Sequence, residues 1–392
     1  MGQINLIKTS CRNLKSLFFR IIFCLLSLFR RLCRRNVSKA YLILKHDGLG
    51  DLVLWTPYSL KLKEHIHRQN GTMILAVANF NVEIARHLHL ADIVISIPVY
   101  QGSSLKYLRD RLKFYYLCGT AKFEKIAQAT LSNAAVAGYL IDPLTAGEKL
   151  SLRDPTNKES GLERFFDHLV DTGDETIHGR YQLFFKALTG VECGSLSPVC
   201  VEELSEIAGS SQNEEDYITV CIGGSLPQKR WPWRYWSELL REICHIFQGS
   251  VLIIGDSSQG EGAEKIIASL PQYTRIINCC GTYRAVQLYP LLRNAKFNVS
   301  MDTGPAHIAA AVGGTVFVIC GNGDRGIFFP YPREYGEGEN VFSIFPPELG
   351  CSRCRNLDAE CLQLPTFRCI SEVSPGQVFN AVNEFLRSRK EC

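Results

Sequence analysis

Short apolar runs separated by polar, glycine-containing segments dominate the chain from residue 41 onward. Apolar runs of about four to eight residues, bounded by turn residues, are typical of buried strands in a parallel sheet. In the first half we expect strands at 41–44, 73–78, 92–99 and 135–141. In the second half we expect them at 217–223, 251–256, 275–281, 297–302 and 315–321.

Helical periodicity alternates with these runs. We expect helices at 105–117, 165–170, 179–188, 233–244, 306–312 and 373–387, and we interpret 142–178 as mostly loop and insertion. Such alternation predicts an α/β fold with parallel sheets. The polar stretch 205–216 separates two similar series, so we expect two Rossmann-like domains facing a cleft, at 40–205 and 216–350. A cysteine-rich tail and a closing helix then occupy 351–392.

The first 39 residues follow a different pattern. Apolar residues recur at spacings of three and four between Leu14 and Leu32, which is the period of one helical face. This arm carries nine basic residues and no acidic one. The pattern predicts an amphipathic helix that lies on an anionic membrane surface. The alternatives are a helix that packs on the protein itself and a short signal-anchor.

Overall charge and cysteine content narrow the class of protein. The net charge is +4, so the chain outside the basic arm is mildly acidic, and no nucleic-acid partner is expected. Of the 16 cysteines, several lie within apolar runs, as reduced and buried thiols do. Four cluster near the C-terminus: Cys351, Cys354, Cys361 and Cys369. They predict a structural Zn²⁺ or iron site, and unmetallated thiols are the alternative.

The first motif that could carry chemistry is KHDGLGDLVLWTP, residues 45–57. Gly48 and Gly50 permit a tight turn and a close backbone approach after the strand. Asp51 then lies near a helix N-terminus at the carboxyl edge of a sheet, where ligands of open α/β sheets bind. There it could act as a general base toward a hydroxyl group. The alternative is an aspartate that caps the helix.

The second motif is IGGSLPQKRWPWRYWSELL, residues 222–240. Gly223 and Gly224 follow a strand and would let a phosphate approach the backbone. Lys229 is placed to meet a diphosphate, with a solvated loop lysine as the alternative. We interpret Trp231 and Trp236 as packing residues.

The third motif is MDTGPAHIAAAVGGTVFVICGNGD, residues 301–324. The turn at Thr303 and Gly304 opens a helix whose N–H groups and dipole favour phosphate oxygens. His307 would reach the same phosphate or a sugar hydroxyl, unless it is a structural histidine bonded to the backbone. Asp302 ends the strand, and its alternative role is the helix N-cap.

In this order, the three motifs resemble those of glycosyltransferase family 9, the bacterial lipopolysaccharide heptosyltransferase family. The resemblance rests on Lys45, Gly50-Asp51 and Thr56-Pro57, on Lys229-Arg230-Trp231-Pro232, and on Asp302 through Ala311, and it covers about residues 41–385. It implies a GT-B fold with an acceptor domain followed by a donor domain. It further implies that Asp51 is the base and that Lys229, also catalytic, holds the donor with Gly50, Gly223, Gly224, Asp302, Thr303, Gly304 and His307. Glu261 would bind the ribose, with Asp256 as its competitor.

The implied reaction is transfer of heptose from ADP-heptose to a lipopolysaccharide-type acceptor, with inversion and without a catalytic metal. The basic arm suits a peripheral enzyme on the cytoplasmic face of the inner membrane. The arm and the segment 142–178 depart from the family pattern and border the acceptor half. A nucleotide-sugar epimerase-like GT-B enzyme and a non-catalytic nucleotide-sugar-binding protein at the membrane surface are the alternative functions.

Overall fold

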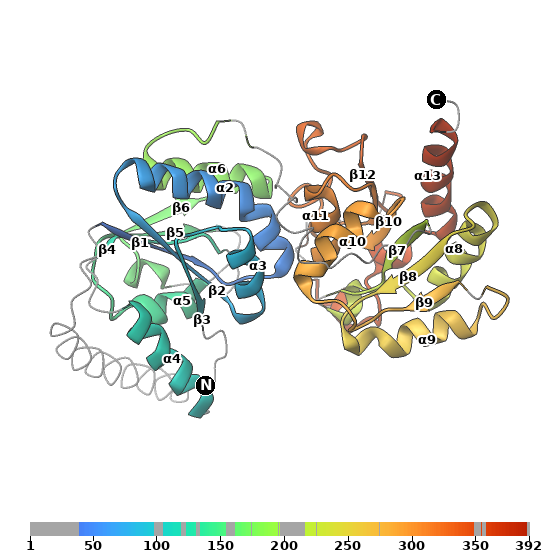
Figure 1. Ribbon diagram of the computed structural model, residues 1–392, viewed down its shortest axis with the longest axis horizontal. Coiled ribbons are helices and arrows are strands. Elements are labelled where there is room, and N and C mark those ends of the chain that lie inside the picture. The colour runs from blue at the N-terminus through green and yellow to red at the C-terminus, as the bar shows by residue number, and fades with distance from the viewer. Residues whose placement is uncertain are drawn as a thin grey trace. The chain divides into compact units, whose positions relative to one another are not determined.

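A computed structural model describes residues 39–389, with gaps at 98–104, 119–122, 131–133, 154–160, 174, 195, 197–215, 225, 274, 349–353 and 355–357. The chain divides into two compact units, Met1–Ser197 and Pro198–Cys392 (Figure 1). The expected amphipathic arm, apart from Lys39, and nearly all of the expected linker lie outside the described residues. None of the helices in the described ranges is long and apolar enough to cross a membrane.

The first unit is built on a six-stranded sheet. Its strands are β1 (Ala40–Lys45), β2 (Thr72–Ala78), β3 (Ile93–Ile97), β4 (Phe123–Gln128), β5 (Ala146–Arg153) and β6 (His168–Asp171). All neighbours pair in parallel, in the order β3-β2-β1-β4-β5-β6. Every residue of β1 is buried, as the continuous apolar run predicts for a strand that helices cover on both faces.

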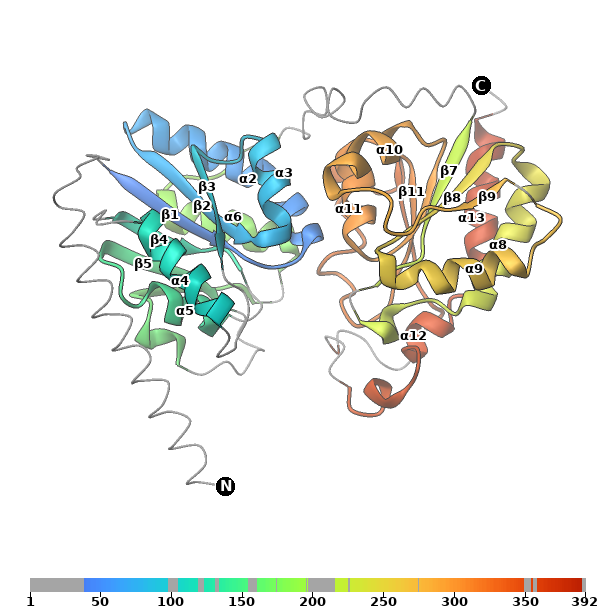
Figure 2. The same ribbon diagram turned by 60° about the horizontal axis from the view of Figure 1, so that its bottom comes forward.

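Helices cover both faces of this sheet (Figures 1 and 2). On one face lie α2 (Leu49–Arg68) and α6 (Ile177–Thr189), where Trp55 contacts Tyr181 and Phe184 edge-on. On the other lie α4 (Leu105–Cys118) and α5 (Ala134–Ile141), whose apolar residues form one core with β1. The short elements η1 (Asn79–Asn81), α3 (Val82–His87) and η2 (Leu162–Arg164) complete the unit.

Several sequence-based expectations for the first unit are wrong. The run 135–141 forms helix α5 rather than a strand, since alanine and leucine suit a helix and a short apolar run does not distinguish the two. The segment 142–178 contains β5 and β6 instead of only loop, and β6 replaces the second half of the helix expected at 165–170. Strand β4 was not expected, because FEKIAQ contains no continuous apolar run.

The second unit repeats the same architecture. Its strands are β7 (Tyr217–Cys221), β8 (Ser250–Ile254), β9 (Ile276–Asn278), β10 (Asn298–Met301), β11 (Val316–Ile319) and β12 (Val341–Ile344). They are parallel, in the order β12-β11-β10-β7-β8-β9. Counted from each unit's own first strand, the two orders are identical. The five strands expected here are confirmed with shifted ends, and β12 is additional.

The helices of the second unit also form two layers (Figure 2). On one face, α8 (Trp233–Ile246), α9 (Gly260–Ala268) and the closing helix α13 (Pro375–Ser388) share a core with the sheet. On the other lie α10 (Leu288–Asn294) and α11 (Gly304–Ala311). Short helices η3 (Pro227–Lys229), η4 (Ser257–Gln259), η5 (Ala285–Gln287), η6 (Arg333–Tyr335), η7 (Cys361–Gln363) and α12 (Arg368–Ser371) occupy the connections.

Candidate functional site

Each sheet has one topological switch point, between β1 and β4 in the first unit and between β7 and β10 in the second. Ligands of open α/β sheets bind outside the carboxyl ends of the strands at such points. Asp51 follows β1, the glycines 223 and 224 follow β7, and Asp302 follows β10 directly. The fold therefore places these residues of each unit at that unit's own switch point, whereas Asp256 and Glu261 follow β8.

Asp51 is the third residue of α2 and is partly exposed. Gly48 is the N-cap of that helix, so the alternative that Asp51 itself caps the helix is wrong. A carboxylate in the first turn is stabilised by the helix dipole and can still face solvent. The φ of Gly48 is −65°, which other residues also adopt, but a Cβ there would lie 3.2 Å from Asp51 Oδ2. Glycine therefore leaves room for the Asp51 carboxylate.

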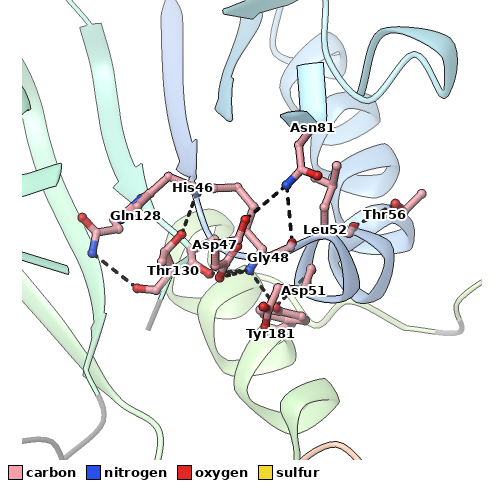
Figure 3. A network of polar contacts seen from close by, with 12 residues as sticks. His46, Asp47, Gly48, Asp51, Leu52, Thr56, Asn81, Gln128, Thr130 and Tyr181 are labelled. Atoms are coloured by element: carbon pink, nitrogen blue, oxygen red, sulfur yellow. Dashed lines mark hydrogen bonds and ion pairs between the residues drawn. The ribbon is translucent and has the colours of Figure 1, made fainter. Parts of the chain in front are cut away.

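A second carboxylate in the same turn, Asp47, lies in a polar network that the sequence did not reveal (Figure 3). Its Oδ2 lies 2.6 Å from Nζ of the fully buried Lys45. Burial raises the pKa of Asp47, while the charge of Lys45 acts in the opposite direction. Because this carboxylate is buried in an ion pair, the partly exposed Asp51 is the one that a hydroxyl substrate can reach.

Lys229 ends η3 and projects into a pocket of the second unit, which is also lined by Asp302, Asp324 and Gly321. Its Nζ lies 2.9 Å from Asp324 Oδ2, and the two side chains are 23% and 14% exposed. The alternative of a solvated loop lysine is therefore wrong. An ammonium group donates three hydrogen bonds, so Lys229 can hold Asp324 and still donate to a ligand oxygen.

The start of α11 lies beside this pocket. Thr303 is the N-cap and Gly304 the first helical residue, so the alternative that Asp302 caps the helix is wrong. The Thr303 hydroxyl donates to the carbonyl of Met301 at 3.3 Å and makes no cap hydrogen bond to the helix. Such a helix start, with N–H groups directed outward, is suited to phosphate oxygens.

His307 is buried and joins two polar groups. Its Nδ1 lies 2.6 Å from the Tyr331 hydroxyl, and its Nε2 lies 3.6 Å from Asp302 Oδ1. Phe329 stacks on the imidazole at a centroid distance of 4.9 Å. Burial, with Asp302 nearby, raises the pKa of Tyr331 well above its ordinary value, so the hydroxyl remains protonated. His307 therefore lies between Tyr331 and Asp302, and it is not one of the residues that line the pocket.

The glycines after β7 have different surroundings. A Cβ on Gly223 would lie 2.6 Å from Gln259 Oε1, so a side chain there would displace the end of Gln259, whereas Gly224 has ordinary contacts. Gln259 in turn bonds Asp256, whose carboxylate also accepts from the Ser258 N–H at 2.8 Å. Asp256 thus serves a local capping box.

The other candidate for the ribose, Glu261, lies in the first turn of α9 with its side chain 82% exposed. It pairs with Lys265 at 2.6 Å, and this hydrogen bond lowers the pKa of the carboxyl group. Trp231 and Trp236 are buried and contact each other edge-on at 5.0 Å, which confirms their packing role.

Three of the four clustered cysteines fall within the described part of the chain. Cys354 and Cys361 are partly exposed and Cys369 is buried, while Cys351 lies outside that part. Among the described residues, no three His, Cys, Asp or Glu side chains are grouped so that they could hold a metal ion. The metal prediction therefore depends on Cys351 and stays a prediction.

Two parallel doubly wound sheets, each with its site residues at the switch point, define a GT-B fold. Solved structures of this class resemble the chain along most of its length. A glycosyl transferase family 9 protein from Veillonella parvula covers 91% of this chain and 99% of its own, with a TM-score of 0.66 at 14% identity. The Escherichia coli heptosyltransferase WaaC with ADP-2-deoxy-2-fluoro heptose covers 89% and 99%, with a TM-score of 0.64 at 16% identity.

The chain belongs to glycosyltransferase family 9 (heptosyltransferase), whose model matches residues 127–341. Lipopolysaccharide heptosyltransferase 1 of Pseudomonas aeruginosa is 25% identical over 246 residues, which are 61% of this chain and 63% of that protein. Lipopolysaccharide heptosyltransferase 2 of E. coli K12 is 31% identical over 107 residues, 26% of this chain and 30% of that protein. The matches thus span less than two thirds of these relatives. The resemblance inferred from the three motifs is confirmed.

Proposed function

We propose that this protein transfers a heptose from ADP-heptose to a hydroxyl group of a lipopolysaccharide-type glycan, with inversion at the anomeric carbon. The observation that carries the proposal is the family match, which spans β10, α11 and the residues that follow them. The similarity to two lipopolysaccharide heptosyltransferases supports the choice of sugar and acceptor. Asp51 lies at the switch point of the first unit and provides a candidate general base, which a transferase needs and a simple binding protein does not.

In the proposed reaction, the Asp51 carboxylate accepts the proton of the acceptor hydroxyl as its oxygen attacks the anomeric carbon. The bond between that carbon and the diphosphate oxygen breaks on the opposite side of the sugar. ADP departs with the bonding electron pair. Lys229 and the outward N–H groups at the start of α11 stabilise the charge that develops on the diphosphate. These groups would perform the role that a metal ion has in other transferases, so we propose no catalytic metal.

Three further parts of the proposal rest on sequence. The basic residues 1–39 would hold the enzyme at the cytoplasmic face of the inner membrane, near a lipid-linked acceptor. The exposed Glu261 would bind the ribose after its ion pair with Lys265 breaks.

The four C-terminal cysteines would bind Zn²⁺ or iron in a structural site. A solved GT-B neighbour of 15% identity, TibC from enterotoxigenic E. coli, is an iron-containing dodecameric glycosyltransferase.

The test is a transfer assay with the full-length chain, ADP-heptose and a heptose-accepting core glycolipid. We expect ADP release that depends on the acceptor, and a glycolipid heavier by one heptose. Asp51→Ala should abolish transfer and leave ADP binding intact, because Asp51 lies in the first compact unit, whereas Lys229 and the start of α11 lie in the second. Donor turnover without an acceptor would instead support an epimerase-like enzyme. Donor binding with no turnover on any acceptor would support a binding protein.

A further inference from the structure

The last residue of β1, Lys45, is a cation completely enclosed by the first unit. Its side chain is 0% exposed, yet Nζ has three partners: Asp47 Oδ2 at 2.6 Å, the Tyr181 hydroxyl at 2.8 Å and the Ala129 carbonyl at 3.3 Å. An ammonium group carries three donors, so this set satisfies Lys45 completely. Burial of a charge is unfavourable unless it is paired and hydrogen-bonded, which is the arrangement here.

The same network reaches the turn that carries Asp51 (Figure 3). The Tyr181 hydroxyl, which accepts from Lys45, lies 3.4 Å from the backbone oxygen of Asp51. Asn81, from η1, donates its side-chain amide to the carbonyls of Asp47 and Gly48 at 3.2 and 3.4 Å. Residues 47–51 are thus fixed from β1, from α6 and from η1. A turn held from three elements leaves little freedom to the carboxylate at its end.

Lys45 pairs with Asp47 in a cluster of charges around Tyr181 that also includes Asp51 and Arg180. Burial, together with the nearby carboxylates of Asp47 and Asp51, raises the pKa of Tyr181 well above its ordinary value, so its hydroxyl remains a neutral donor. Tyr58 from α2 also raises the pKa of Tyr181, whereas the positive charge of Arg180 from α6 lowers it. His178 contacts Tyr58 at 3.2 Å, and burial lowers its pKa to about 4, so it adds no positive charge near neutral pH. His46 lies in the same turn, and its amide N–H donates to Thr130.

We infer that Lys45 is the positioning residue for Asp51: its buried charge, acting through Asp47 and Tyr181, fixes the catalytic turn and favours the ionised carboxylate. The inference rests on the proposed function, because it assigns a role around the base of that reaction. A positively charged neighbour stabilises a carboxylate, so the acid limb of the pH–rate profile should depend on Lys45. The competing explanation is that Lys45 only neutralises the buried Asp47.

The two explanations differ in the double variant Lys45→Met/Asp47→Asn, which removes the cation and its buried counter-ion together. If Lys45 only neutralises Asp47, the double variant should recover wild-type turnover. If Lys45 acts on Asp51, kcat should stay down by about 100-fold, the usual size of a general-base contribution. In Lys45→Met alone, the acid limb of kcat/KM should lie about one pH unit higher, since loss of a neighbouring positive charge raises a carboxyl pKa. The double variant also loses the negative charge of Asp47, so kcat is the quantity that decides there.

The experiment measures transfer by the full-length chain from pH 5 to 9, with thermal unfolding and ADP binding measured on each variant. Lys45→Arg keeps the charge and should recover part of the turnover. Lys125→Met is the matched control. Lys125 also forms an ion pair in this sheet, with Glu148 at 2.7 Å, but its side chain is 27% exposed and it lies far from Asp51 in sequence. It should leave kcat and the acid limb unchanged.

Recovery of wild-type kcat in the folded double variant would overturn the inference while leaving the proposed function intact. Absence of transfer by the wild-type chain would instead remove the proposed function. If Lys45→Met alone does not fold, the double variant and Lys45→Arg still decide the question, because neither leaves Asp47 as an unpaired buried carboxylate.

Discussion

The ion pair between Lys229 and Asp324 gives a prediction about ADP binding to the pocket of the second unit, which can be tested without an acceptor. The two side chains line one pocket with Asp302, so a single ammonium faces two carboxylates there. If Lys229 contacts the donor diphosphate, Lys229→Met removes a charge-assisted hydrogen bond. Such bonds contribute about 1.5–3 kcal/mol, so we expect ADP binding to weaken by about 10- to 100-fold.

Asp324→Asn should have the opposite effect and strengthen ADP binding. A phosphate oxygen bound on the far side of the ammonium lies about 3 Å from Nζ, and therefore about 5 Å from the Asp324 carboxylate. At an effective dielectric constant of about 20, one pair of charges at that distance repels by about 3 kcal/mol. Partial exposure and salt reduce this repulsion, so we expect about 1 kcal/mol, or roughly five-fold tighter binding.

Titration calorimetry with ADP, at low and at physiological salt, measures both effects. Lys296→Met is the control, because Lys296 forms an exposed ion pair with Asp216 in the same unit, and it should not change ADP binding. If Lys229→Met bound ADP as tightly as the wild type, Lys229 would not contact the diphosphate. If Asp324→Asn weakened binding as much as Lys229→Met, Asp324 would orient the lysine instead of opposing the anion.

Four further predictions concern other residues. Phe80, 60% exposed beside Asn81, can stack on a sugar ring, so Phe80→Ala should raise the KM for acceptor several-fold with unchanged ADP binding in steady-state kinetics. Trp236→Ala should lower the free energy of unfolding by about 3–5 kcal/mol in urea denaturation, because Trp236 is 1% exposed. Burial lowers the pKa of His178 to about 4, so the unfolded chain takes up the proton first as pH falls. The His178 contribution should therefore be complete above about pH 6.5 and decrease by roughly 3 kcal/mol toward pH 4, and His178→Gln should flatten that dependence of thermal stability on pH. The purified chain should contain about one zinc or iron per molecule by elemental analysis if the cysteine cluster is a metal site, and Cys351→Ser should remove it.

The sequence predicted the strands that consist of continuous apolar runs, such as β1 and β8, because burial on both faces leaves no polar position. It did not predict β5, in which only three of eight residues are buried, or β6, a four-residue edge strand. Strands of this kind are stabilised by pairing with their neighbours, and that pairing has no signature in the local pattern.

The candidate site was predicted to a similar extent. Asp51 and Lys229 were identified because glycine, proline and a strand end surround each of them. Their partners were not: Asp324 is 95 residues from Lys229, and Tyr181 is 136 residues from Lys45. One signal was present for Lys45. A lysine that ends a continuous apolar strand must find a buried anion, and Asp47 is only two residues away.

Comparison of the two switch points shows why one topology supports two kinds of chemistry. Lys45 ends β1 itself, so it lies beneath the turn, is fully buried and stabilises an anion that belongs to the protein. Lys229 comes eight residues after β7, at the end of η3, so it lines a pocket and remains 23% exposed to an anion from solution. A cation enclosed by its own fold can only set the state of a neighbouring group, whereas one that lines a pocket can bind a ligand. Under the proposed function, the distance of the lysine from its strand therefore separates a base-supporting edge from a phosphate-binding edge, even though the strand orders are the same.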